Sequence, residues 1–277
     1  MRHTIIQSII LGLAAPGIAA APCDRRVLKV ATDRYLVAQS TGDNRWLESV
    51  LEADTTYWEN LVLTNITNGT LTQALRIDHS RTSFDLLHCA TYTELIATDP
   101  SRLLVSPGYI RKDPSTGKIK RLDGIFTTTG DLFFNASHTL HYTLLEDWSD
   151  IPVEHRDSRA TLQAAADAYY DVFVNKTVSV PWGKPCTRLE GGYLDANGSC
   201  DTDIPEVDIR TIDRRYVIDE TLGVVNVISN FGILGPDSHE FRILNGTIRQ
   251  IHSMTLCRPN INCGVTVPAI LSDDIGF

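Results

Sequence analysis

The densest group of titratable side chains lies in the segment 76–96. Asp78, His79, Arg81 and Asp85 fall within eight residues of this segment. A histidine beside a carboxylate can act as a general base, and an arginine nearby can bind a carboxylate or an oxyanion. We therefore predict His79 as a catalytic residue and Arg81 and Asp85 as substrate-binding residues. The competing interpretation is a polar surface loop without a function.

Two further histidines occur in alternating, strand-like patterns. His252 alternates with Ile248 and Met254, and His239 alternates with Phe241, so each imidazole is predicted on the apolar face of a strand. An imidazole in such a place can accept a proton near neutral pH. His252 is predicted as catalytic and His239 as substrate-binding. The alternative for His252 is a hydrogen-bonded core histidine.

Charged residues flank His239 in the stretch 237–242. We interpret Asp237 as the turn residue that begins the strand, and Glu240 and Arg242 as facing water. A carboxylate that orients the ring of His239 is the other possibility.

Arg188 and Glu190 stand two residues apart, so on a strand they share a face. Burial would raise the pKa of this glutamate into the range useful for proton transfer. Glu190 is predicted as catalytic and Arg188 as substrate-binding, against the alternative of a structural ion pair. Glu59 takes the matching place in the first half and is predicted as substrate-binding.

Tyr142 is predicted on a strand as the first-half counterpart of His252, where a phenol could act as a general acid. A core aromatic residue is the alternative. His138 and His141 stand on the same expected strand, and residues three apart face opposite sides of a strand, so they cannot share an ion. The chain has no G-x-S-x-G, H-E-x-x-H, Walker or G-x-G-x-x-G motif. We expect no metal and no cofactor.

The elements that position these residues follow from a repeated pattern. The segments 28–35 and 162–169 both fit L-x-x-A-x-D-x-Y, 134 residues apart, and apolar residues recur in each at helical spacing. Three further matches between the halves follow in the same order. Glu59 aligns with Glu190, the loop 113–117 with the loop 219–223, and Asn135 with Asn245, each of these asparagines before an alternating strand. Four ordered matches predict a duplicated unit of one helix, one strand and two hairpins.

The sequence also predicts a turn, an insertion and a linker. Asn245-Gly246 predicts a two-residue hairpin turn. The segment 71–99 is interpreted as an insertion that the second half largely lacks, and the polar stretch 146–159 as the linker.

The N-terminus has a basic start, an apolar stretch and a small-residue zone, which together predict a signal peptide over residues 1–21. Secretion agrees with an even number of cysteines, six, because thiols oxidise outside the cytosol. Cys186 and Cys200 flank a Gly/Asn-rich loop and favour a local disulfide. Cys23 with Cys89 and Cys257 with Cys263 follow only by elimination among 15 connectivities.

Six N-x-[ST] sequences behind a signal peptide indicate a glycoprotein, and a glycan marks surface. The predicted acceptors are Asn65, Asn68, Asn135, Asn175, Asn197 and Asn245. The chain has a formal net charge of -9 and no cluster of lysine and arginine, which argues against nucleic acid and anionic membranes as partners. We expect a secreted protein, or one of the secretory-pathway lumen.

A helix layer followed by a curved antiparallel sheet resembles the cone-shaped α+β fold of the nuclear-transport-factor-two-like (SnoaL-like) superfamily. The stretches CTRLEGG, RRYVIDETLG, DSHEFR and IHSMTLC are similar to a group of secreted fungal proteins of unassigned function. The resemblance implies two tandem cones, each a curved antiparallel sheet covered by helices, at residues 22–148 and 160–257. A linker at 149–159 and a C-terminal extension at 258–277 complete the chain.

The fold in question hosts isomerases, dehydratases, cyclases and binding modules. The leading expectation is cofactor-independent acid–base chemistry on a small apolar or phenolic molecule, by isomerisation, dehydration, cyclisation or elimination, in a setting such as fungal natural-product biosynthesis. A non-catalytic ligand-binding or host-interaction protein and an extracellular carbohydrate lyase or hydrolase are the alternatives. The exposed sheet faces are expected to pair, which makes the monomer an internal pseudo-dimer.

Overall fold

The computed structural model describes residues 23–195, 198–202 and 204–266. The predicted signal peptide, the sequon at Asn197 and residues 267–277 of the predicted extension lie outside the described residues. Among the described helices, none is long and apolar enough to cross a membrane.

The chain forms two six-stranded mixed sheets with the same topology. The first contains β1 (Leu51–Glu59), β2 (Val62–Thr64), β3 (His79–Asp85), β4 (Ala90–Ala97), β5 (Leu104–Lys112) and β6 (Ile119–Gly124). The second contains β7 (Trp182–Glu190), β8 (Tyr193–Asp195), β9 (Thr211–Asp219), β10 (Val224–Phe231), β11 (Pro236–Leu244) and β12 (Thr247–Thr255). The strand orders are β2-β1-β6-β5-β4-β3 and β8-β7-β12-β11-β10-β9. Adding six to each strand number converts one order into the other, so the two halves share a topology. Each sheet has six strands and not the expected five, and it is mixed and not antiparallel throughout, because β1 pairs with β6 and β7 with β12 in parallel.

One long helix precedes each sheet. α1 (Arg25–Thr41) begins at Asp24, whose side chain accepts a hydrogen bond from the backbone of Val27, and it ends at Gly42 in the left-handed conformation. α3 (Arg159–Asp171) begins at Ser158, whose side chain caps the helix in the same way. The described residues also contain four short 3-10 helices: η1 (Asn44–Leu47), η2 (Thr70–Thr72), η3 (Val153–His155) and η4 (Ile261–Gly264).

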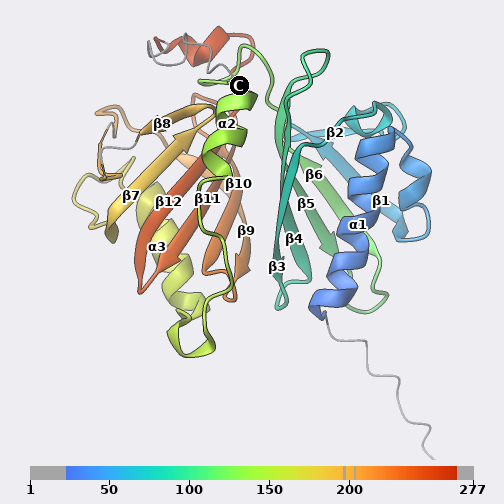
Figure 1. Ribbon diagram of the computed structural model, residues 1–277, viewed down its shortest axis with the longest axis horizontal. Helices are drawn as coiled ribbons and strands as arrows, with labels where there is room; N and C mark the ends of the chain where they lie inside the picture. The colour runs from blue at the N-terminus through green and yellow to red at the C-terminus, as the bar shows by residue number, and fades with distance from the viewer. Residues whose placement is uncertain (1–22, 196–197, 203, 267–277) are drawn as a thin grey trace, which may run out of the picture.

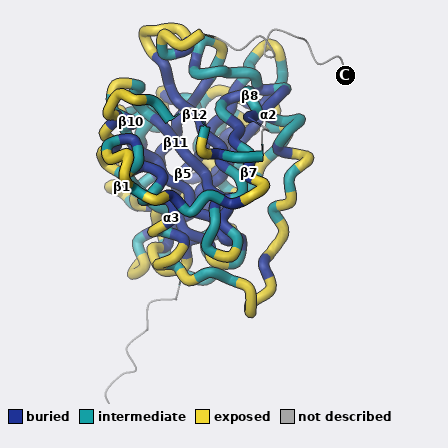
Figure 2. The backbone as a smooth tube through the Cα atoms, turned by 90° about the vertical axis from the view of Figure 1, so that its left-hand side faces the viewer, coloured by how far each residue is buried: buried dark blue, intermediate teal, exposed yellow. Residues whose placement is uncertain are grey.

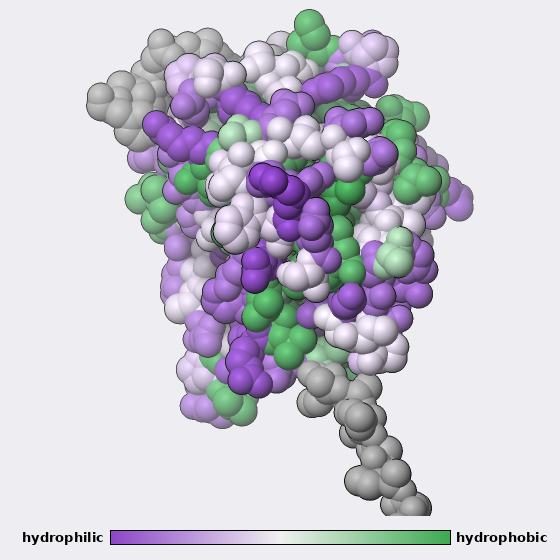
Figure 3. Space-filling model, turned by 90° about the vertical axis from the view of Figure 1, so that its right-hand side faces the viewer, coloured by the Kyte–Doolittle hydropathy of each residue, from purple (hydrophilic) through white to green (hydrophobic). Residues whose placement is uncertain are grey.

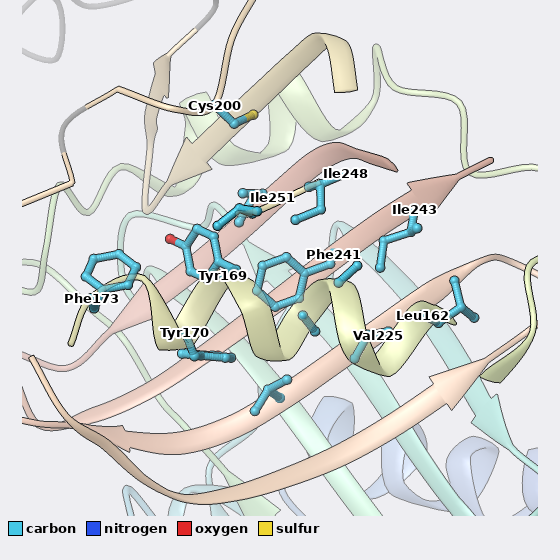
Figure 4. Packing of buried hydrophobic residues seen from close by; sticks show 14 of the residues in the cluster. Leu162, Tyr169, Tyr170, Phe173, Cys200, Val225, Phe241, Ile243, Ile248 and Ile251 are labelled. Atoms are coloured by element: carbon cyan, nitrogen blue, oxygen red, sulfur yellow. The ribbon is translucent and has the colours of Figure 1, made fainter. Parts of the chain in front are cut away.

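α1 and α3 cover the outer faces of their own sheets (Figure 1), and each buries an apolar stripe there. In the second half, Leu162, Tyr169 and Tyr170 of α3 pack on Phe241 and Ile251 of the sheet (Figure 4). Burial runs along the central strands and exposure gathers at the turns (Figure 2). On the side of the molecule that carries α1, hydrophilic and apolar residues are intermixed (Figure 3).

The opposite faces of the two sheets pack on one another. Tyr92 and Tyr109 of the first sheet share an apolar cluster with Val217 and Ile228 of the second. The Tyr92 hydroxyl is 2.8 Å from Oγ of Ser238. Two repeated halves therefore meet face to face within one chain, which is the arrangement expected of an internal pseudo-dimer.

One predicted strand is wrong. The stretch after Phe133 forms a helix, α2 (Ala136–Thr143), because Asn135 caps it by accepting a hydrogen bond from the backbone of His138 at 3.0 Å. Asn135 is therefore not the counterpart of Asn245. His138 and His141 lie three apart on a helix, so the strand argument against a shared ion does not apply to them.

The segment 71–99 is not an insertion. It contains β3 and β4, which correspond to β9 and β10 of the second sheet. The loops 113–117 and 219–223 close different hairpins, β5–β6 and β9–β10. The turn at Asn245-Gly246 is confirmed: it joins β11 to β12 with both residues at positive φ, 53° and 69°.

All three predicted disulfides form: Cys23–Cys89, Cys186–Cys200 and Cys257–Cys263. Of the sequons in the described residues, Asn65, Asn68, Asn175 and Asn245 are exposed, and Asn135 is half-buried at the start of α2.

Candidate functional site

The second half contains a cavity of about 560 Å³ between α3, the sheet and the segments that cover its open end. Tyr169 and Phe173 contribute one wall, and His239 and Arg188 contribute polar groups from β11 and β7. Phe133, which precedes α2, also lines the cavity. The lining is mostly aromatic and aliphatic with a few polar groups, which is typical of small-molecule sites.

A chain of hydrogen bonds leads from the sheet into this cavity. Nδ1 of His239 is 2.6 Å from Oδ1 of Asp237, and Nε2 of His239 is 3.2 Å from the hydroxyl of Tyr169. Thr255 donates its hydroxyl to the other oxygen of Asp237 at 2.7 Å. Because Asp237 is an acceptor, Nδ1 donates to it, and in the neutral imidazole this arrangement leaves Nε2 with a lone pair toward the cavity.

Tyr169 acts as a donor in this chain. Burial raises the pKa of its phenol above the usual value, and the nearby Arg188 only partly offsets this. The protonated hydroxyl therefore donates to Nε2 of His239. Figure 4 shows the ring within the apolar cluster, with its oxygen directed toward the end where Phe173 and Cys200 lie.

Arg188 and Glu190 stand on the same face of β7, as their spacing predicts. Nε of Arg188 is 3.2 Å from Oε1 of Glu190, and Nη1 donates to the carbonyl of Thr202 at 2.9 Å. The Arg188 side chain is 3% exposed and that of Glu190 is 19% exposed. The cavity thus holds one buried guanidinium and one carboxylate that solvent reaches.

The first half lacks an equivalent base. The strand registers place Gly108 of β5 where His239 lies on β11, and Tyr35 of α1 takes the place of Tyr169. A Cβ at Gly108 would lie 2.5 Å from the hydroxyl oxygen of Tyr35, so a larger side chain has no room there. The Tyr35 hydroxyl is buried and has no hydrogen-bond partner among the described residues.

The interior of the first half is also filled. Leu71 of η2 is fully buried in the core beneath α1. Glu59 accepts hydrogen bonds from the Tyr57 hydroxyl and from the backbone of Thr70, at the edge of a separate hollow of about 540 Å³. Glu59 is therefore held by its own chain and not presented to an apolar cavity.

A second polar cluster lies between the two sheets, away from the cavity. It contains His252, which was predicted to face the apolar interior of the second half. Its Nδ1 is 2.9 Å from Glu94 and its Nε2 is 2.7 Å from Glu146. Arg81 bridges Glu94, at 3.0 Å, and Glu240. Glu240 is paired with His252 and is the neighbour of His239 on β11, so both side chains lie on the face of the second sheet opposite His239 and the two polar clusters are distinct.

The charged groups of this cluster shift one another's pKa values. Burial disfavours the imidazolium of His252, but Glu146 and Glu94 outweigh it and raise the pKa to about 10. Burial likewise disfavours ionised Glu94, yet Arg81 and His252 lower its pKa to about 2. Burial, with Glu94 adding to it, raises the pKa of Glu240. A histidine held as imidazolium between two carboxylates cannot accept a further proton, so its geometry favours a structural role.

Glu94, Glu240 and His252 are the described residues whose spacing could accommodate a metal ion, with ligand atoms within 4.8 Å of one another. Arg81 already places a guanidinium between the two glutamates. The positive charge that a cation would supply is therefore present in the protein itself. The donor set fits an internal ion-pair network better than a metal centre.

Three other predicted residues lie outside the cavity. His79 lies at the edge of the cluster between the sheets, with Nε2 3.9 Å from Glu94, and burial lowers its pKa. Asp85 is fully buried and binds Arg159 of α3. Tyr142 lies on α2, with its ring beside His141. Of the nine predicted site residues, the structure brings His239, Arg188 and Glu190 together in one cavity.

The sequence analysis preferred Asp237 as a turn residue over the alternative of a carboxylate that orients His239, did not single out Tyr169, and misplaced two charged residues. Asp237 is buried and hydrogen-bonded to His239, and Tyr169 appeared only as one apolar position of a helix. The signal for Asp237 was its spacing of two from His239, which puts both side chains on one strand face. Glu240 and Arg242 do not face water: they are 1% and 4% exposed.

The fold and the cavity define a two-sheet α+β protein in which the second half has a pocket beneath its helix, whereas Tyr35 fills the equivalent place beside Gly108 in the first half. Residues 155–255 match a family described as a domain of unknown function (DUF8021). The matched range starts just before α3 and ends with β12, so it coincides with the half that holds the cavity. No curated protein matches the chain.

Proposed function

We propose that the chain is an enzyme of the secretory route, built from two SnoaL-like halves, that performs cofactor-independent acid–base chemistry in the cavity of the second half. The substrate is a small, mostly apolar or phenolic molecule. The observation that carries the proposal is the Asp237–His239–Tyr169 chain, whose imidazole and phenol both line that cavity. The setting in fungal natural-product biosynthesis rests on the sequence resemblance alone.

Tyr169, His239, Arg188 and Asp237 each have a role in this proposal. The carbonyl or phenolic oxygen of the substrate replaces Nε2 of His239 as the acceptor of the Tyr169 hydroxyl, and Arg188 stabilises charge that develops on that oxygen. Nε2 then takes a proton from an adjacent carbon, and Asp237 stabilises the imidazolium that results. The proton returns to another atom of the same substrate, so the sum is an isomerisation and nothing else is consumed.

The aromatic and aliphatic lining supports an apolar substrate. Phe133, Phe173 and Phe231 contribute three rings around the cavity, and its volume of about 560 Å³ lies in the range typical of small-molecule sites. The single buried guanidinium of Arg188 matches one oxygen atom and not a highly charged ligand. An apolar ketone, enone or phenol fits these properties.

Hydrogen–deuterium exchange tests the proposal without knowledge of the natural substrate. The secreted protein is incubated in D₂O with a panel of aryl ketones, enones and phenols, and loss of carbon-bound protons is followed by NMR. We expect exchange of at least one compound above the buffer rate. His239→Asn should reduce it by about 10²–10⁴-fold, the usual contribution of a general base, while binding persists.

The first half provides the matched control. Tyr169→Phe should slow the exchange, whereas Tyr35→Phe, at the equivalent position beside Gly108, should leave it unchanged. Saturable binding without exchange by any compound would favour the ligand-binding alternative. Exchange that survives His239→Asn would show that the base has been assigned wrongly.

A further inference from the structure

The cavity of the second half takes its polar and its apolar lining from different parts of the chain. Among the described residues that line it, the polar side chains stand on α3 and on strands of the sheet, as Tyr169, Arg188, Glu190 and His239 do. The connecting segments, which include the stretch before β9, the β10–β11 turn and the stretch after β12, contribute apolar side chains. One part of the wall can therefore bind a polar group, and another part offers apolar surface alone.

These two parts of the lining also differ in exposure. Tyr169 and His239 are buried. Ile233, Val207 and Val265 of the connecting segments are 84%, 60% and 47% exposed, so the cavity opens to solvent past them. We call these three side chains the apolar rim. Single exposed apolar residues are normal on a protein surface, whereas three that line one cavity are typical of a ligand-binding surface.

The first half shows that the fold itself does not require an apolar rim. Its hollow of about 540 Å³ is lined by residues of the corresponding segments, the β4–β5 turn and the stretch before β3. These segments contribute Arg102 and Gln73, whereas the second half has Ile233 and Val207 in the equivalent segments. The Arg102 guanidinium donates to the backbone carbonyl of Ala74 at 3.2 Å. The apolar rim therefore belongs to the half that holds the cavity.

We propose that the ligand of this cavity is an amphiphile, a ketone or phenol that carries a long alkyl chain. The inference rests on the proposed function for the place of the polar head, whose oxygen lies between the Tyr169 hydroxyl and Arg188. The chain leaves the cavity along the apolar rim and covers its three side chains, which a shorter ligand would leave in water. Burial of apolar surface supplies most of the affinity, and the two polar side chains determine which end of the ligand enters.

Three para-hydroxyphenyl ketones that differ only in chain length test the inference: para-hydroxyacetophenone, para-hydroxyhexanophenone and para-hydroxydecanophenone. Their dissociation constants for the secreted protein are measured by isothermal titration calorimetry. Complete burial of one added methylene group would raise the affinity about fourfold. We expect the affinity to rise at each step of the series, by about 10²-fold or more in all, because the rim covers only part of the chain.

A variant of the rim separates contact with the chain from general apolar binding. Ile233→Ser combined with Val207→Ser replaces two exposed side chains, so the fold should persist. We expect this double variant to bind para-hydroxydecanophenone about tenfold or more weakly, and to bind para-hydroxyacetophenone as tightly as the native chain does. Val153→Ser removes an exposed apolar side chain of η3 outside the cavity, and it should change neither affinity.

Three results would overturn the inference. One is the absence of binding by all three ketones. Another is an affinity that stops rising at para-hydroxyhexanophenone, which would mean that the chain ends inside the cavity. The third is a double variant that weakens both the shortest and the longest ketone equally, or neither. If that variant instead releases the protein from phosphatidylcholine vesicles or abolishes self-association, the rim contacts a lipid surface or a second copy of the chain.

The chain-length series and the exchange experiment can fail separately. A rise in affinity that depends on the rim, without exchange of carbon-bound protons in any of the ketones, would support the amphiphile and contradict the proposed acid–base chemistry. Exchange of the methyl protons of para-hydroxyacetophenone, with no gain in affinity from a longer chain, would support that chemistry and overturn the amphiphile.

Discussion

Asp85 of β3 binds Arg159 of α3, and this contact between the halves has an exact counterpart 134 residues away. Two nitrogens of Arg159 lie 2.9 and 2.7 Å from the two oxygens of Asp85. In the counterpart, Nη2 of Arg25 on α1 lies 2.9 Å from both oxygens of Asp219 on β9. The helix of each half therefore neutralises a buried carboxylate of the other half.

Backbone groups complete the same arrangement. Phe84 donates its N–H to Asp219 at 2.9 Å, and Ile218 donates to Asp85 at 3.1 Å. Each carboxylate thus binds a backbone group near the end of a strand in the opposite sheet, as well as the first residue of a helix.

Asparagine substitutions test these contacts. Asp85→Asn should lower the free energy of unfolding by about 3–5 kcal/mol, since it leaves a mostly buried guanidinium unpaired. Asp219→Asn should cost less, because Arg25 is 38% exposed and water can solvate it, whereas Arg159 is 19% exposed. Urea denaturation of both variants measures the difference. An equal and small loss for both would contradict the prediction.

Asp237→Asn tests the orientation of the base. An amide can present its NH₂ to Nδ1 of His239, which would move the imidazole proton to Nε2 and abolish its lone pair. We expect the exchange reaction to fall by about 10²-fold or more with little change in ligand affinity. Ser106→Ala, at the matching position of the first half, is the control and should retain full exchange. A loss of affinity with unchanged exchange at saturation would indicate that Asp237 only shapes the cavity.

The central cluster predicts a pH dependence of stability. The pKa of His252 rises from 6.5 to about 10 on folding, so its contribution is complete below about pH 6.5 and is lost as the pH rises toward 10. The pKa of Glu94 falls from 4.5 to about 2, so its contribution is present above pH 4.5 and is lost as the pH falls toward 2. We therefore expect His252 and Glu94 together to stabilise the folded protein most between about pH 4.5 and pH 6.5.

His252→Gln isolates the alkaline half of that profile. The difference in Tm between the native chain and this variant should be largest near pH 6.5 and should shrink toward pH 10. Differential scanning fluorimetry across this range measures it. A difference that does not change with pH would mean that His252 is neutral in the folded protein.

Leu71→Ala tests whether the core of the first half and the cavity of the second half are independent. Removal of this fully buried side chain from the core of the first half should cost about 2–5 kcal/mol of stability. Because the cavity lies in the second half, we expect ligand binding there to be unchanged at temperatures where the variant is folded. A parallel loss of binding would show that the two halves are coupled more closely than their separate cores suggest.

The sequence predicted the duplication because the helices and first strands kept their spacing. Leu28 and Leu162 start equivalent stripes, and Glu59 and Glu190 end equivalent strands. The alignment failed after Phe133, where Asn135 could be interpreted as a turn before a strand or as a helix cap. Periodicity over a short segment does not distinguish a helix from a strand. The hydrogen bond from the backbone of His138 to the Asn135 side chain favours the helix.

The candidate site was predictable in part. The spacing of Arg188 and Glu190 placed them on one face of a strand, and alternation placed His239 on an apolar face. His252 alternates with apolar residues in the same way, yet its face packs on another sheet and not on a helix. A strand with two buried faces gives no sign in sequence of which face borders a cavity.

The reciprocal arginine contacts also constrain how this chain can change over evolutionary time. Each half alone would expose the apolar sheet face that its partner now covers, so we expect neither half to be stable by itself. A substitution at Asp85 or Asp219 removes a contact of both halves at once, because each carboxylate pairs with an arginine of the other half. The space beneath each helix lies away from this interface, and it holds a cavity in the second half and packed side chains in the first.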